Sequence, residues 1–226
     1  ANETLARVIV ASVQTLRSEN RRKMIRDVGL IICDEAHHAV ASTYLSVFEH
    51  YGAMGPVRED SAVAVGFTAT MMRGDDLALG EVWQDVVYER SIAEMIAEGH
   101  LVRPRGIHVQ VDDLDLSKVK TTRGDYNEGQ LGQAIEESLA PSAIAKAVAE
   151  HAQDRKMILF APTVSSAGVI ADALSASGAP AALVHGGMPA GERRAVLDAY
   201  RRRTGGLRVL ANCQLATEGF DDPETD

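Results

Sequence analysis

The chain has 226 residues, which allows one large domain or two smaller ones, and 46% of them are apolar, so an intrinsically disordered protein is excluded. A net charge of −9 argues against a protein that grips nucleic-acid phosphates over its whole surface, but it leaves room for a locally basic cleft. No apolar stretch approaches the roughly 20 residues that span a bilayer, and Cys33 and Cys213 lie inside apolar runs without metal-type spacing, which predicts a cytoplasmic protein without a membrane segment.

Apolar runs of strand length alternate with helical patterns along the chain, which predicts an α/β fold with a mainly parallel sheet. The expected elements, in chain order, are strands at residues 8–13, 28–33 and 62–67, a helix at 91–98, a strand at 107–111, a helix at 143–153, a strand at 156–161, a helix at 165–177, a strand at 181–184, a helix at 190–203 and a strand at 207–211. Residues 112–129 are polar and lack periodicity, so a loop or a mobile insertion is expected there. Pro104 follows the helix stop at Gly99, and a domain boundary is therefore expected near residues 101–105.

Two adjacent carboxylates, Asp34 and Glu35, follow the second predicted strand in the sequence Asp-Glu-Ala-His, which ends at His37. In an open α/β sheet, ligands bind at the carboxyl ends of the strands. One carboxylate there can hold Mg²⁺ while the other activates a water molecule for attack on a phosphate. The structural alternative is that Asp34 caps the next helix and Glu35 complements the helix dipole. A zinc site at His37 and His38 is disfavoured, because adjacent histidines point in different directions.

Hydroxyl side chains follow two other predicted strands. Thr68 and Thr70 come directly after residues 62–67, and their hydroxyls can hydrogen-bond Asp34 or His37 across the crevice. Thr163 follows residues 156–161, where its hydroxyl can donate to a phosphate or cap the next helix. The residues alone leave both roles of Thr163 open.

These segments resemble, in order, the motifs of the superfamily 2 helicases of the DEAD/DEAH-box kind. Residues 34–37 resemble motif II, residues 68–70 resemble motif III, and residues 156–164 resemble motif IV. Residues 209–223 resemble motif V, in the T-E-G-x-D-x-P version of restriction-type enzymes and related translocases. Each motif is weak alone, and their order over nearly the whole chain makes the resemblance specific.

The resemblance implies that ATP and Mg²⁺ are the cofactors. It makes Asp34 the metal ligand, with Asp34, Glu35 and His37 as the catalytic residues. It assigns Thr68 and Thr70 to the contact that couples hydrolysis to domain movement. A magnesium ion held in this way neutralises charge on the departing phosphate.

The resemblance also implies where nucleotide and nucleic acid bind. Gly219 allows the backbone to approach a nucleotide closely, and Asp221 can accept a hydrogen bond from a ribose hydroxyl. Ser12, Gln14 and Thr163 are the candidate contacts to nucleic acid, of which DNA is favoured over RNA. A plain turn between a strand and a helix is the structural alternative for Ser12 and Gln14.

The fold implied is two RecA-like domains with mainly parallel sheets, both incomplete. Residues 1–100 correspond to the C-terminal part of the first, ATP-binding domain, and residues 101–226 to a truncated second domain. No G-x-x-x-x-G-K-[ST] loop and no arginine-rich motif VI occur in the chain. We therefore expect a fragment of an ATP-dependent helicase or translocase that is inactive in isolation. The alternative is a non-catalytic helicase-like module that binds nucleic acid or protein. A nuclease that uses the acidic pair and the histidines is the least favoured interpretation.

Overall fold

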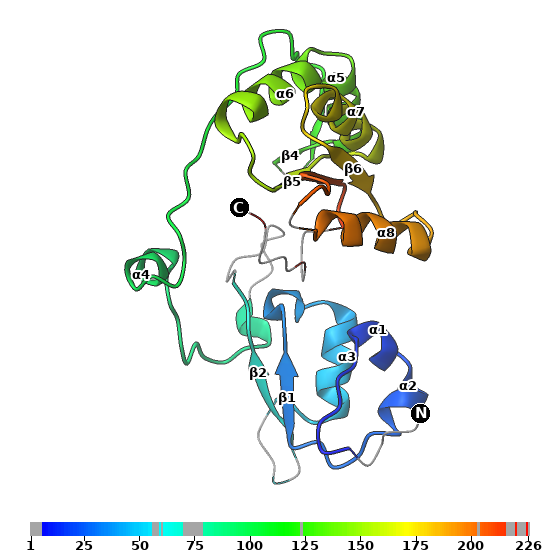
Figure 1. The fold of residues 1–226 in the computed structure, drawn as a ribbon. Coiled ribbons are helices and arrows are strands. Elements are labelled where there is room, and N and C mark those ends of the chain that lie inside the picture. Colours follow the sequence, from blue (N-terminus) through cyan, green and yellow to red (C-terminus); the bar gives the residue numbers. More distant parts are fainter. Residues whose placement is uncertain are drawn as a thin grey trace. The chain divides into compact units, whose positions relative to one another are not determined.

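A computed structural model describes residues 6–55, 59, 61–69, 79–122, 124–202, 204–215, 220 and 225 of the chain. Contacts divide the chain into two compact units, Ala1–Arg103 and Pro104–Asp226, each with its own parallel sheet (Figure 1). The predicted α/β fold with parallel sheets is confirmed. Within the described ranges, no helix combines the length and the apolar character that a membrane span requires.

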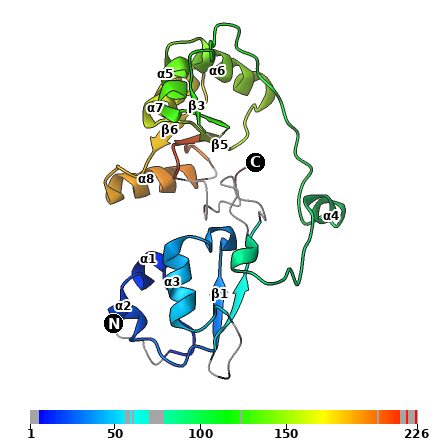
Figure 2. The same cartoon turned by 180° about the vertical axis from the view of Figure 1, so that it is seen from behind.

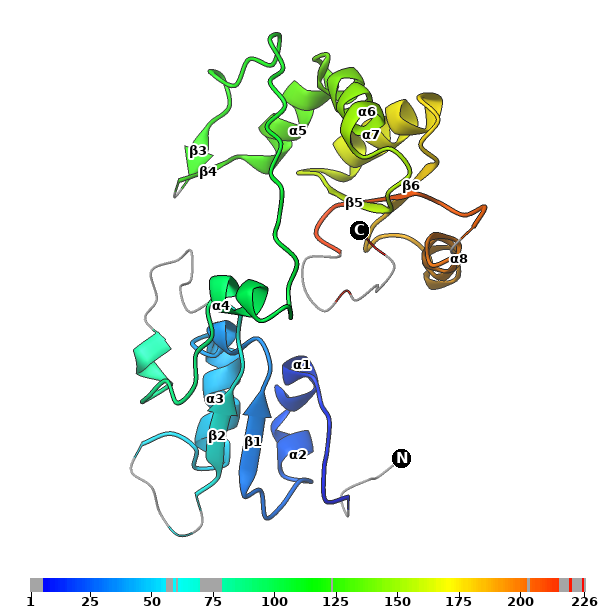
Figure 3. The same cartoon turned by 60° about the vertical axis from the view of Figure 1, so that its left-hand side comes forward.

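The first unit is built on two parallel strands. Its described elements are α1 (Val13–Leu16), α2 (Glu19–Arg22), β1 (Leu30–Cys33), η1 (Ala36–His38), α3 (Ser42–His50), β2 (Val63–Gly66), η2 (Leu79–Glu81) and α4 (Ile92–Ala97). β1 and β2 run side by side (Figure 3). Leu30 lies opposite Val63, and Cys33 lies opposite Gly66. This register brings the carboxyl ends of both strands to one edge of the sheet.

The core of the first unit lies on one face of this sheet. Successive side chains of a strand point to opposite faces. α3 lies beside β1 (Figure 2). Ile31 and Cys33 face this helix, where they pack with Phe48. Leu30 and Ile32 point to the other face and are 55% and 66% exposed. The packing of α3 thus holds β1 in place at Cys33, the residue before Asp34.

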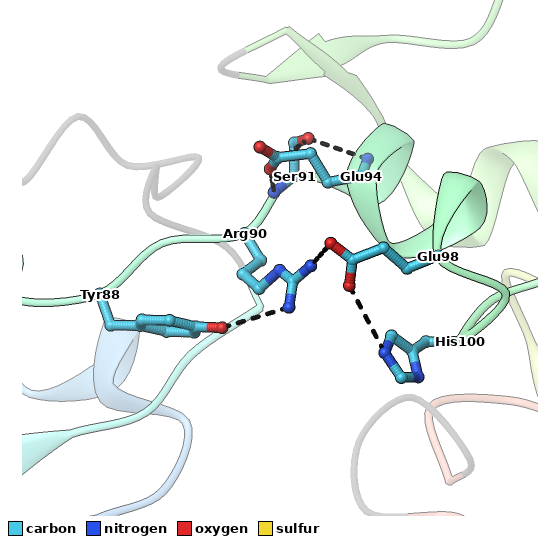
Figure 4. Close-up of polar contacts among 6 residues, drawn as sticks. All are labelled: Tyr88, Arg90, Ser91, Glu94, Glu98 and His100. Atoms are coloured by element: carbon cyan, nitrogen blue, oxygen red, sulfur yellow. Dashed lines mark hydrogen bonds and ion pairs between the residues drawn. The ribbon is translucent and has the colours of Figure 1, made fainter.

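The predicted helix that stops before Gly99 is confirmed as α4. Its N-terminus is a capping box, in which Ser91 Oγ accepts from the Glu94 amide at 3.2 Å and Glu94 Oε2 accepts from the Ser91 amide at 2.7 Å (Figure 4). The amide and the hydroxyl of Ser91 both donate to Glu94 Oε2, and these two hydrogen bonds lower the pKa of the Glu94 carboxyl. Arg90 forms an ion pair with Glu98 across the helix, and Gly99 follows with a φ of 78°.

The second unit is built on three parallel strands. Its described elements are β3 (Thr121–Thr122), β4 (Asp125–Tyr126), α5 (Glu128–Glu136), α6 (Ala140–His151), β5 (Met157–Phe160), α7 (Val164–Ala176), β6 (Ala181–Val184), α8 (Ala190–Tyr200) and β7 (Val209–Asn212). The strand order is β5-β7-β6, so β7 is central. Its side chains are buried on both faces, as expected for a strand between two helical layers.

Alternation along β7 decides which helix each residue contacts. Val209 and Ala211 lie in clusters with α7, whereas Leu210 packs with Tyr200 of α8. Tyr200 is fully buried, and its hydroxyl donates to the carbonyl of Met157 at 3.2 Å. This hydrogen bond satisfies the polar end of an otherwise apolar contact.

Three expectations from the sequence are wrong within the described residues. Residues 8–13 and 107–111 form no strand, and Val10 is 96% exposed. A strand exists only where its backbone groups find a partner, which an apolar pattern alone does not supply. Residues 112–129 are not a featureless loop, because they contain the β3–β4 hairpin and the first residues of α5.

Candidate functional site

The acidic pair lies at the edge of the first sheet where β1 and β2 both end. Backbone hydrogen bonds between the two segments continue beyond the ends of β1 and β2. The Phe67 amide donates to the Cys33 carbonyl at 2.9 Å, and the Ala36 amide donates to the Phe67 carbonyl at 2.8 Å. The segments after β1 and β2 are therefore held together by backbone bonds. This edge is the position at which α/β sheets bind ligands.

Asp34 and Glu35 adopt a backbone arrangement that differs from an ordinary helix cap. Asp34 is exposed, and its Oδ1 accepts from the amide of Glu35, its immediate neighbour, at 3.0 Å. Glu35 has a left-handed conformation, with φ 49° and ψ 50°, and precedes the short helix η1 without a side-chain cap. The alternative in which Asp34 caps a helix is therefore wrong.

His37 connects the acidic segment to the end of β2. Its Nδ1 lies 3.0 Å from Thr68 Oγ1 and 3.4 Å from Glu35 Oε2. Of the two partners that the sequence left open for this hydroxyl, Asp34 and His37, Thr68 contacts His37. Both oxygen atoms lie near the same ring nitrogen, and the tautomer of His37 decides whether that nitrogen donates or accepts a hydrogen bond.

The residues of this edge fit a magnesium ion held mainly by water and phosphate. Among the described residues, no partner other than the Glu35 amide is found for the Asp34 carboxylate, and no group of three or more metal-binding side chains gathers. Mg²⁺ commonly takes one or two protein carboxylates and keeps several water ligands. Asp34 suits that role, whereas a protein cage of the kind that zinc needs is missing from the described part of the chain.

The core beneath the acidic pair is apolar. Cys33 is 7% exposed, and its burial, with a smaller contribution from the charge of Asp34, raises the pKa of the thiol to about 11. The thiol is therefore protonated at neutral pH and is a poor nucleophile. The groups available for chemistry at this edge are therefore the carboxylates of Asp34 and Glu35 and the imidazole of His37.

The remaining predicted residues fall outside this group. Thr70, Gly219 and Asp221 lie outside the described residues. Ser12 caps α1, where its Oγ accepts from the amide of the residue three positions ahead at 3.2 Å. Gln14 lies in α1 and is exposed. The predicted contacts of Ser12 and Gln14 with nucleic acid stay predictions.

Thr163 is a helix cap in the second unit. Thr163 and Ser166 form a capping box at the start of α7, with the Ser166 amide donating to Thr163 Oγ1 at 3.0 Å and the Thr163 amide donating to Ser166 Oγ at 3.2 Å. A Cβ placed on Gly132 of α5 would lie 2.5 Å from Thr163 Oγ1. The capping role that the sequence left open is thus the one observed, and α5 packs closely against it.

Replacing Thr163 with alanine is expected to lower the free energy of unfolding of the second unit by about 1 kcal/mol, the usual effect of removing an N-cap hydroxyl. Urea unfolding followed by circular dichroism measures the change. Thr163→Ser keeps the hydroxyl and is expected to unfold like the original chain. If the alanine variant kept its stability and lost affinity for DNA, Thr163 would be a phosphate contact rather than a cap.

Trp83 and Gly66 belong to this edge, although neither residue was selected from the sequence on functional grounds. Trp83 Nε1 donates to the Ala36 carbonyl at 3.1 Å, and the ring lies against Gly66. A glycine inside an apolar strand is a signal of close approach. That signal was present at Gly66, whereas nothing in the pattern around Trp83 pointed to the site.

Comparisons with known proteins identify the family. Residues 1–73 match the model of the Type III restriction enzyme, res subunit, and residues 140–226 match the helicase conserved C-terminal domain. IRC3 of Saccharomyces cerevisiae, which is named as an ATP-dependent helicase, is 32% identical over 97% of this chain and 32% of its own length. A Schizosaccharomyces pombe protein named as the mitochondrial ATP-dependent helicase irc3 is 32% identical over 98% of this chain and 36% of its own length. A 51.5 kDa protein of a Lactococcus phage is 28% identical over 92% of this chain and 43% of its own length.

Among solved structures, Dbp5 L327V of S. cerevisiae bound to Gle1 H337R and IP6 is 18% identical, covers 98% of this chain and 48% of that one, and has a TM-score of 0.49. The chain spans about a third of the length of the two curated IRC3 relatives. The two family matches occur in the order that the motifs predicted. Together with the helicase relatives, they confirm the predicted likeness of this chain to a fragment of a superfamily 2 helicase.

Proposed function

We propose that this chain supplies the acidic part of the ATPase site of a helicase or translocase, in which ATP hydrolysis drives movement along nucleic acid. The observation that carries the proposal is the hydrogen bond between His37 Nδ1 and Thr68 Oγ1, at 3.0 Å. It joins the acidic segment after β1 to the residues after β2. A link of this kind allows a change at the nucleotide to reach a neighbouring segment.

Each side chain at the edge has a separate task in the proposed reaction. Asp34, exposed at the end of β1, holds the hydrated Mg²⁺ that accompanies ATP. The ion, when bound, neutralises charge on the phosphate oxygens. Glu35 orients the attacking water and accepts its proton. His37 lies 3.4 Å from Glu35 Oε2 and 3.0 Å from Thr68 Oγ1, so its task is to connect the acidic segment to the residues after β2.

We propose DNA rather than RNA as the nucleic acid. The version of motif V in residues 209–223 and the match of residues 1–73 to a restriction-enzyme subunit support this choice. Ser12 and Gln14 are exposed in the first unit and are the proposed contacts to the strand. Competition between single-stranded DNA and RNA of the same sequence tests the preference.

The 226-residue chain is expected to hydrolyse ATP no faster than buffer, because it contains no G-x-x-x-x-G-K-[ST] loop to hold the phosphates. A coupled ATPase assay with and without single-stranded DNA measures the rate. Turnover by this chain that disappears in Glu35→Gln would contradict the expectation. A longer version, extended by the coding sequence on both sides, is expected to hydrolyse ATP and to be stimulated by DNA.

The missing phosphate loop also favours a second candidate function, a non-catalytic module that binds nucleic acid or protein. The longer version separates the two functions. If the extended protein contains the loop and turns over ATP, the module is excluded. If the extension brings no such loop and the protein binds DNA without hydrolysing ATP, the proposed ATPase function is overturned.

A further inference from the structure

Trp83 contacts the segment that follows β1 through a hydrogen bond and a packing contact. Its indole Nε1 donates to the carbonyl of Ala36 at 3.1 Å. Its ring meets Phe48 of α3 edge-on, with centroids 5.7 Å apart and planes at 72°. Phe48 is 2% exposed and belongs to the buried core of the first unit. The indole therefore ties the acidic segment to the core.

Gly66, the last residue of β2, makes this contact possible. A Cβ at Gly66 would lie 2.7 Å from the Cβ of Ala36 and 2.7 Å from Cζ2 of Trp83. Both distances are too short for carbon atoms, so a larger residue would force the indole or η1 to move. The end of β2, the start of η1 and the indole consequently pack at one point.

Glu35 needs this support because its backbone is left-handed, at φ 49° and ψ 50°. A residue other than glycine holds such a conformation only where its surroundings fix it. The Glu35 amide donates to Asp34 Oδ1, and the Glu35 carbonyl accepts from the His38 amide. The Ala36 amide donates to the Phe67 carbonyl, and the Ala36 carbonyl accepts from both the Ala39 amide and the Trp83 indole. Of these hydrogen bonds, the indole bond is the one that comes from a side chain outside residues 34–37.

We propose that Trp83 is a positioning residue for the hydrolysis proposed above, on which this inference rests. By holding the Ala36 carbonyl, it keeps Glu35 in the conformation that presents its carboxylate at the sheet edge, within 3.4 Å of His37 Nδ1. Trp83 acts through the backbone of Ala36. Its contribution is to the geometry of Glu35, and the unit retains its core when the indole N–H is removed.

Hydrogen exchange of the 226-residue chain, measured by NMR, tests the positioning role. Trp83→Phe keeps an aromatic ring against Phe48 and removes the donor. Exchange of the Ala36 amide is expected to accelerate about three- to tenfold, the effect of losing one neutral hydrogen bond. Amides inside α3 are expected to keep their rates, because a local change leaves the rest of the unit intact.

Tyr51→Phe is the matched control. The Tyr51 hydroxyl also donates to a backbone carbonyl of the first unit, that of Arg22 at 3.2 Å, and Tyr51 lies at the other end of α3 from η1. This variant is expected to leave the Ala36 amide unchanged. The proposal is overturned if Trp83→Phe leaves the exchange of Ala36 unaltered, or if it accelerates α3 by the same factor.

ATP hydrolysis by the longer version provides the functional measurement. Trp83→Phe is expected to lower kcat several-fold with an unchanged KM for ATP, and Tyr51→Phe is expected to change neither. An active protein in which Trp83→Phe has full kcat would overturn the positioning role and leave the proposed function standing. An inactive protein would overturn the proposed function, whereas the exchange experiment would still report whether Trp83 holds the segment.

Discussion

Replacing Gly66 with alanine is expected to destabilise the first unit by about 1–3 kcal/mol, which is the usual effect of overpacking a filled site. The added methyl group would lie 2.7 Å from both the Ala36 Cβ and the Trp83 ring. Neither neighbour is a flexible chain end, since Ala36 is 3% exposed and Trp83 is held by a hydrogen bond and by Phe48. Relief therefore requires η1 or the end of β2 to shift.

Urea unfolding followed by tryptophan fluorescence measures this change for the first unit alone, because Trp83 is the one tryptophan in the sequence. Gly29→Ala is the matched control. It lies just before β1, where a Cβ would meet nothing within 4 Å. We expect its free energy of unfolding to stay within about 0.5 kcal/mol of the original value. Equal stability of the two variants would show that the packing around Gly66 yields easily.

The sequence predicted the elements best where local pattern and burial agree. β6 occupies the predicted residues 181–184, and α7 and α8 begin within a residue of their predicted starts. Residues 8–13 have the same apolar character and form no strand in the described chain. The difference lies in partners, since β6 pairs with β7 over its whole length. The residue composition of a segment indicates whether it suits a β-sheet. Whether it becomes a strand depends on hydrogen-bonded pairing with a neighbouring strand.

The candidate site was predictable where it follows from strand order. Asp34 directly follows β1 and Thr68 comes two residues after β2, and these strands form one parallel pair, so both residues are expected at the same sheet edge. The contact of Trp83 with Ala36 spans 47 residues and starts from a segment without regular structure. No periodic pattern relates the two positions. Thr163 shows a further limit, because a hydroxyl that caps a helix and one that binds phosphate are the same residue in the sequence.

In the longer version of the protein, Glu35→Gln is expected to lower kcat by about two to four orders of magnitude, the range for loss of a general base. Glutamine keeps the size of the side chain and its hydrogen-bonding oxygen, but it cannot accept the proton of the attacking water. The KM for ATP is expected to change little, because Glu35 is proposed to act on the water rather than to hold the nucleotide. Steady-state ATPase kinetics with saturating DNA measure both constants.

Glu19→Gln is the control for the loss of one negative charge from the first unit. Glu19 lies in α2, where it pairs with Lys23 at 2.5 Å, and it is expected to leave kcat unchanged. A Glu35→Gln variant with full kcat and a raised KM would assign Glu35 to nucleotide binding. If the activity of Glu35→Gln fell only as far as its folded fraction fell, the role of residue 35 would be to hold the left-handed backbone, and its carboxylate would not be needed for catalysis. The large fall in kcat of a fully folded protein is the result that the geometry of the acidic edge leads us to expect.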